Sequence, residues 1–77
     1  MSLSPELKAI AMIQSCTSSP EAFRGNFSKL CDYQYNLIEA SVLVNRAELY
    51  MSDEDVKILC KSQKNKEVMN FFHSKLQ

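Results

Sequence analysis

The side chains best suited to nucleophilic or acid–base catalysis are one histidine, His73, and three cysteines, Cys16, Cys31 and Cys60. A catalytic base needs a nucleophile and an orienting group within hydrogen-bond reach. The residues that a helix would place beside His73 are apolar instead, which is typical of a histidine at the edge of a hydrophobic core. We therefore predict that the chain is not an enzyme.

The cysteines do not form a pattern typical of a disulfide framework or a zinc site. Their number is odd, they lie far apart, and no C-x-x-C pair occurs. We expect structural thiols, no bound metal or cofactor, and a reducing, cytoplasmic compartment. The longest early apolar run, Ala9 to Ile13, is shorter than the ~7 to 15 residues of a signal sequence. We expect no membrane association, and export by a route without a cleavable signal stays open.

A pair of aspartates, Asp53 and Asp55, could bind a cation or transfer protons. They directly follow Ser52, however, and Glu54 lies between them. A serine followed by several carboxylates is typical of a helix start, because the hydroxyl caps a backbone amide and the acids stabilise the positive helix end. The pattern predicts that a helix begins at Ser52.

Four lysines, Lys57, Lys61, Lys64 and Lys66, form a basic cluster. Lys57 and Lys61 would share one helix face, so the cluster could contact phosphates or an acidic protein groove. The whole chain carries nine basic and nine acidic side chains, which gives no general attraction to nucleic acid or an anionic membrane. A solvated helix end is the simpler interpretation, and nucleic-acid binding is the alternative function.

The composition predicts an all-α fold. The 77 residues include one glycine, two prolines and a single threonine, which disfavours the turn-rich and β-branched composition of a sandwich or barrel. Ser4-Pro5-Glu6 and Ser19-Pro20-Glu21 each combine a serine cap, a first-turn proline and an acid, and so predict two helix starts. We expect one domain, residues 1–77, folded as a small bundle of three or four helices.

Apolar residues recur every seven positions through the middle of the chain, and no proline interrupts them. This spacing predicts one long central helix, from about 20 to 51, with a kink near Gly25 or Tyr33 as the alternative. Such a helix would be roughly 48 Å long, whereas a compact chain of this size is only ~30 Å across. One end should therefore overhang the domain. The recurring residues, called the seam, are Phe23, Leu30, Leu37, Val44 and Met51.

A second apolar line runs beside the seam through Cys31, Tyr35, Ile38, Val42 and Leu49. The combined apolar arc is wider than the ~100° typical of a helix on the surface of a monomer. We therefore predict a non-enzymatic protein-interaction module, of the adaptor, inhibitor, secretion-chaperone or assembly-subunit type, that binds a partner protein or itself. A central helix covered only by its own chain is the alternative. The candidate partner-binding residues are Leu37, Val44, Met51, Leu49 and Tyr35.

The last third of the chain predicts two further helical segments. An apolar patch around Val56 and Leu59 follows the start at Ser52, and residues 61–67 are then entirely polar. Val68, Met69 and Phe72 recover helical spacing. We expect a fourth, short helix there, after a break or two solvated turns.

Overall fold

The computed structural model describes residues 4–76, and all of the regular secondary structure in that range is helical. The all-α class predicted from composition is confirmed. Within the described residues, no helix is long and apolar enough to cross a membrane. The described elements are α1 (Pro5–Cys16), α2 (Pro20–Gly25), α3 (Phe27–Asp32), α4 (Leu37–Ala47), α5 (Asp53–Ser62), α6 (Lys66–His73) and a terminal 3-10 turn, η1 (Ser74–Leu76).

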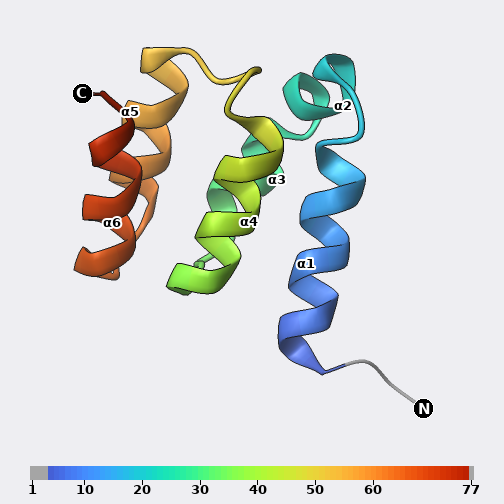
Figure 1. Ribbon diagram of the computed structural model, residues 1–77, viewed down its shortest axis with the longest axis horizontal. Coiled ribbons are helices and arrows are strands. Elements are labelled where there is room, and N and C mark those ends of the chain that lie inside the picture. The colour runs from blue at the N-terminus through green and yellow to red at the C-terminus, as the bar shows by residue number, and fades with distance from the viewer. Residues whose placement is uncertain (1–3, 77) are drawn as a thin grey trace.

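The helices pack in two layers. In Figure 1, α1, α4 and α6 lie side by side in the layer nearer the viewer, while α2, α3 and α5 lie behind them. The closest pairs are α5 with α6, α1 with α4, and α4 with α6. Helices α5 and α6 form an antiparallel hairpin, so η1 packs against α5. This order leaves one side of α1 and α4 facing away from the second layer.

Three predicted helix starts are confirmed. The hydroxyls of Ser4, Ser19 and Ser52 each accept a hydrogen bond from the backbone amide three residues on, at 3.0–3.2 Å. Proline is the first residue of α1 and of α2, where its missing amide leaves no donor unpaired. The short helix predicted near the end of the chain is also present, as α6. The described residues form six α-helices and not the predicted three or four, because the segment predicted as one long helix is divided into three.

The prediction of one long helix over residues 20–51 is wrong, because the segment is divided into α2, α3 and α4. The first division falls at Asn26. Its side-chain amide donates to the carbonyl of Ala22 at 2.7 Å, in competition with its own backbone amide, which donates to the same oxygen at 3.0 Å. Such local bonds disfavour continuous helix. The division lies next to Gly25, one of the two positions suggested for a kink.

The second division is larger and runs from Tyr33 to Asn36, which are not helical. Two glutamines hold this segment against the turn between α5 and α6. The side chain of Gln63 accepts from the amide of Tyr35 at 2.9 Å and donates to the carbonyl of Tyr33 at 2.8 Å. Gln34 makes the reverse pair of bonds, donating to the carbonyl of Ser62 and accepting from the amide of Lys64, both at 2.8 Å. Long-range bonds thus replace the helical ones.

Helix α4 then starts afresh at Asn36. The side chain of Asn36 accepts from the amide of Glu39 at 2.8 Å, and the Glu39 carboxylate accepts from the amide of Asn36 at 2.9 Å. This capping box satisfies two amide donors at the start of α4. Asn36 and Glu39 are close in the sequence, so they cap the start of α4 without any contribution from α3. Helix α4 can therefore begin here as a separate helix.

One hydrophobic core joins all six helices. It contains buried side chains from every layer, of which the largest are Phe23, Phe72, Ile13, Leu30, Leu43, Leu59 and Val68. The radius of gyration is 11.7 Å, within the range of about 11 to 12 Å expected of a compact chain of this length. The accessible surface of 4994 Å² is close to the ~4,800 Å² typical of a folded monomer of this mass. The overhanging helix end predicted from the sequence is therefore wrong.

Candidate functional site

The predicted catalytic candidates do not form a reactive group. His73 and Cys60 line the same groove, of about 360 Å³, between α5 and α6. The Cys60 thiol donates to the carbonyl of Met69 at 3.4 Å, and no hydrogen bond of the described residues joins it to the imidazole. Burial raises the pKa of this thiol, which keeps it protonated near neutral pH. A protonated thiol is a poor nucleophile.

The acidic cluster has a structural role, as expected. The hydroxyl of Ser52 accepts from the amide of Asp55 at 3.1 Å, and the Asp55 carboxylate accepts from the amide of Ser52 at 3.0 Å. This reciprocal pair is a second capping box. Among residues 4–76, no group of three or more histidine, cysteine or acidic side chains is arranged to hold a metal ion.

The structure separates the five candidate partner-binding residues. Val44 and Tyr35 are buried in the core, and Met51 packs half-buried against it. Leu37 and Leu49 are accessible, with 41% and 92% of their surface exposed. Burial of Val44 and Tyr35 within the chain removes them from any partner surface of the folded monomer. The seam as a whole is therefore mainly core.

A surface with exposed apolar side chains remains on α1 and α4, and we call it the outer apolar face. Leu7 lies about 160° around α1 from the buried Ala9, and Ile38 lies about 160° around α4 from the buried Ala40. Both therefore point away from the core. Leu7 is 53% exposed and Ile38 is 59% exposed. The outer apolar face consists of Leu7 and Ile10 on α1, Ile38 and Val42 on α4, and Leu49 in the turn that follows α4.

Two polar contacts align the helices that carry this face. The Asn36 side-chain amide donates to the Glu6 carboxylate at 3.4 Å near the starts of both helices. Near their ends, the Arg46 guanidinium donates to the hydroxyl of Thr17 at 2.8 Å. Helices α1 and α4 consequently run side by side in the same direction (Figure 1). Their outward sides adjoin and form one continuous surface.

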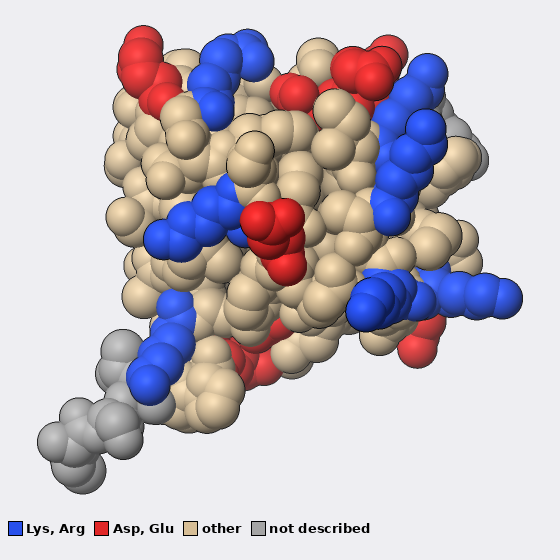
Figure 2. All heavy atoms as spheres, turned by 180° about the vertical axis from the view of Figure 1, so that it is seen from behind, with Lys and Arg blue, Asp and Glu red and all other residues tan. Residues whose placement is uncertain are grey.

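Charged residues are missing from the middle of the outer apolar face. No charged residue occurs from Ala9 to Pro20 or from Ala40 to Asn45. In α4 the acid Glu39 is buried, and Arg46 lies at the end of the helix, bonded to α1. The opposite side of the molecule differs, because acidic and basic side chains are spread across it in Figure 2.

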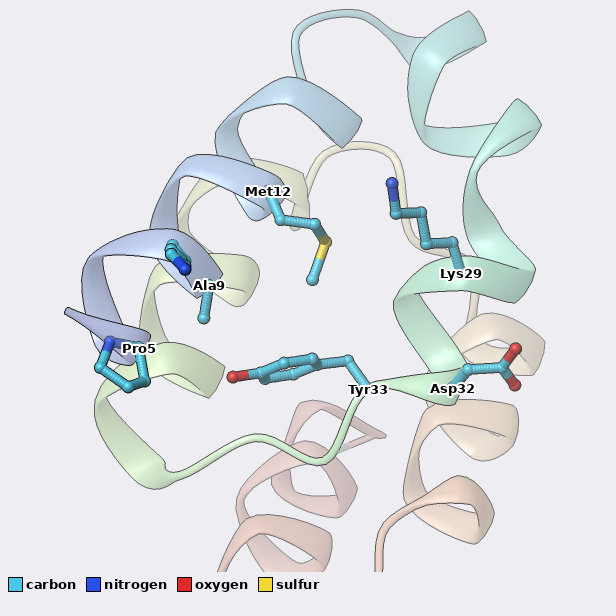
Figure 3. Close-up of a pocket in the computed structure, with 7 residues that line it drawn as sticks. Pro5, Ala9, Met12, Lys29, Asp32 and Tyr33 are labelled. Atoms are coloured by element: carbon cyan, nitrogen blue, oxygen red, sulfur yellow. The ribbon is translucent and has the colours of Figure 1, made fainter. Parts of the chain in front are cut away.

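A groove of about 470 Å³ opens between α1 and α3, and we call it the α1–α3 groove. In Figure 3, the side chains of Ala9, Met12 and Tyr33 point toward one another across this space, with the tyrosine ring along its floor. Lys29 stands at its side, and the carboxylate of Asp32 points away from it. The groove is lined by Pro5, Lys8, Ala9, Met12, Lys29, Asp32 and Tyr33.

The position of the Tyr33 ring is fixed from two sides. Its hydroxyl donates to the Glu39 carboxylate at 3.3 Å, and its ring centroid lies 4.9 Å from that of Tyr35. Burial and the neighbouring Glu39 carboxylate raise the pKa of Tyr33, so the phenol remains a neutral donor. Met12 is the flexible part of the lining, and methionine adapts readily to differently shaped ligands.

The lysine cluster is exposed but divided. Lys57 and Lys61 line the groove between α5 and α6, whereas Lys64 lies in the turn between these helices and Lys66 is the first residue of α6. Basic side chains gather on the α5 and α6 side of the molecule in Figure 2, with acidic side chains nearby. The one ring in the lining of this groove is the His73 imidazole, and no phenylalanine, tyrosine or tryptophan lines it. It therefore offers less stacking surface than the rows of aromatic side chains on which single-stranded nucleic acids bind.

Comparison with models of protein families, with curated proteins and with solved structures gives no match. The sequence could have indicated Leu7, because it is a large apolar residue opposite the buried side of α1. It carried no signal for the α1–α3 groove, since Met12 and Tyr33 are brought together only by the fold.

Proposed function

We propose that this chain is a non-enzymatic helical protein-interaction module that associates with a second copy of itself through the outer apolar face. One observation carries the proposal: Leu7, Ile38 and Leu49 are each more than half exposed, and no charged residue occurs in α1 after Lys8 or in α4 from Ala40 to Asn45. Scattered exposed leucines are ordinary, but an apolar surface shared by two adjoining helices is typical of an interface.

A second copy is the occupant that best suits this surface. A two-fold dimer places the same patch on both subunits, and an uncharged patch can face itself without burying an unpaired charge. The exposed fractions of Leu7, Ile38 and Leu49 together equal about two whole side chains. At ~1.5 to 3 kcal/mol for each apolar side chain, burial in both copies would contribute about 6 to 12 kcal/mol before the cost of association.

The predicted dimer is weak. Helix α1 has 12 residues and is thus about 18 Å long, and two adjoining helices present a surface roughly 20 Å wide. This footprint is at the low end for specific interfaces, so we expect a dissociation constant of roughly 1 to 100 µM. Sedimentation equilibrium over concentrations that bracket this range would measure the mass directly.

The decisive variant is Ile38→Lys, with Ile58→Lys as its matched control. Ile38 lies on the outer apolar face, whereas Ile58 is on α5, which belongs to the other layer, and is 40% exposed. In a two-fold dimer, Ile38→Lys places two like charges in an apolar interface. We expect it to raise the dissociation constant by about tenfold or more, that is by at least ~1.4 kcal/mol, while Ile58→Lys leaves it unchanged. A wild type that stays monomeric throughout, or two variants with equal effects, would refute the proposal.

The cellular setting that we infer is a reducing one. Cys16, Cys31 and Cys60 are all free thiols, which suits the cytoplasm. The alternative function, nucleic-acid binding by Lys57, Lys61, Lys64 and Lys66, would give an affinity that falls steeply with salt. Self-association through an apolar face should change little with salt.

A further inference from the structure

We propose that the α1–α3 groove is a binding site for an acidic segment of a partner protein, in which one bulky apolar side chain enters the groove. The proposal rests on the groove and its lysines, and is independent of self-association through the outer apolar face. The two surfaces share α1 but involve different sides of it.

The floor of the groove selects an apolar side chain. Ala9, Met12 and the ring of Tyr33 face one another across about 470 Å³ (Figure 3). This space is open to solvent and large enough for a leucine, methionine or phenylalanine side chain. The bonds of Tyr33 to Glu39 and its packing on Tyr35 hold the floor in place before any ligand arrives. A preformed floor lowers the entropy that binding must overcome.

The rim of the groove selects acidic neighbours for that side chain. Lys8 lies on α1 and Lys29 on α3, so a basic group stands on each side. Both lysines are exposed, and no carboxylate of the described residues lies within 4.0 Å of either ammonium. Asp32 is the acid in the lining, and its carboxylate points away from the groove in Figure 3. The accessible charge at the rim is therefore positive.

The α1–α3 groove is better suited to this ligand than the groove between α5 and α6. The second groove also has two lysines, Lys57 and Lys61, but it is smaller, at about 360 Å³, and its one ring is the polar imidazole of His73. An aromatic floor offers a large rigid contact area. The groove between α5 and α6 is therefore the main alternative binding site for the peptide, and the experiment must distinguish the two grooves.

The probe is a short fluorescein-labelled peptide with a central phenylalanine, two glutamates on each side and a glycine–serine remainder. Fluorescence anisotropy measures its affinity for the whole chain, and amide shifts of the isotope-labelled protein locate it. We expect shifts at Ala9, Met12 and Tyr33. Peptides with serine in place of phenylalanine, or with lysines in place of the glutamates, should each bind about tenfold more weakly or not at all, because each lacks one of the two matched features.

Charge reversal tests the rim with a matched control. The double variant Lys8→Glu with Lys29→Glu should weaken binding by about tenfold or more at low salt. Lys64→Glu with Lys66→Glu changes the net charge equally, but neither residue lines a groove, so we expect less than about a threefold effect. Equal losses in both double variants would mean that only net charge matters, which would overturn the proposal.

Three other outcomes would also overturn it. Amide shifts centred on Cys60 and Met69 would place the peptide between α5 and α6. Binding of duplex DNA or anionic vesicles that depends on Lys8 and Lys29, without binding of the peptide, would identify a different class of partner. No binding at all at millimolar protein would mean that the groove is not a site. None of these results bears on the dimer, whose concentration dependence should be the same in the Lys8 and Lys29 variant.

Discussion

Replacing Gln63 with alanine should remove a large part of the stability of this chain. Gln63 is only 2% exposed, and it holds the non-helical segment 33–36 against the turn after α5. Its loss leaves the amide of Tyr35 and the carbonyl of Tyr33 without their partner. A buried backbone group without a partner costs ~1 to 3 kcal/mol, so the two together predict a loss of about 2 to 6 kcal/mol.

That loss is large on the scale of the whole molecule. A chain of 77 residues has a free energy of unfolding of about 4 to 12 kcal/mol, and each kcal/mol corresponds to roughly 4 to 8 °C in the melting temperature. We therefore expect Gln63→Ala to melt at least ~10 °C below the wild type. Urea unfolding followed by circular dichroism at 222 nm gives the free energy directly.

Gln34→Ala is the matched control for this substitution. Gln34 makes the same two kinds of bond, both at 2.8 Å, but it is exposed. Water can satisfy the groups left by its removal, so the loss should be about 1 kcal/mol. Equal losses for Gln63→Ala and Gln34→Ala, or a loss below about 0.5 kcal/mol for Gln63→Ala, would refute the reasoning from burial. Gln63→Glu should regain stability as the pH falls, because a protonated carboxyl can again donate to the carbonyl of Tyr33.

Three further predictions follow from the capping box, the core and the thiols. Ser52→Ala should lower the free energy of unfolding by about 0.5 to 2 kcal/mol in urea titrations, and unchanged stability would contradict the cap assignment. Val44→Asp should leave the chain unfolded by circular dichroism, since it buries a carboxylate in the core; a folded variant would show that Val44 is accessible. Burial, with Asp32 and Asp55 nearby, raises the pKa of Cys31 from 9.0 to about 11. The unfolded thiol therefore loses its proton first, and stability should fall from pH 9.0 toward about 11, with a shallower fall in Cys31→Ser.

Helix starts were predictable because their signals are short-range. Ser4, Ser19 and Ser52 each bond to an amide three residues away, so residue types alone determine the cap. The start of α4 follows the same rule. Asn36 and Glu39 have the spacing of a capping box and directly flank an apolar run. This local signal was available in the sequence, and it contradicted the long helix predicted from the heptad spacing.

The rest of the arrangement depends on contacts that no local pattern encodes. Gln34 and Gln63 are 29 positions apart, and each bonds to the backbone on either side of the other. Nothing in their immediate neighbours distinguishes them from solvated glutamines. The α1–α3 groove has the same origin, because Met12 and Tyr33 meet only after α1 packs against α3. Candidate sites of this kind become visible only with the fold.

Periodicity identified some of the buried residues, although not the role of Val44 or the exposure of Leu37, and it misidentified the element that carries them. Leu30 and Val44 are both buried although the segment between them is interrupted, because α3 and α4 face the same core from different directions. The proposed self-association can therefore be tested with two substitutions on opposite sides of α4. Val44 lies on the core side of α4 and Ile38 on its outer side. Val44→Asp should therefore unfold the monomer, whereas Ile38→Lys should leave a folded monomer that no longer pairs. A protein in which both substitutions unfold the chain would have no free face on α4, and self-association through it would be ruled out.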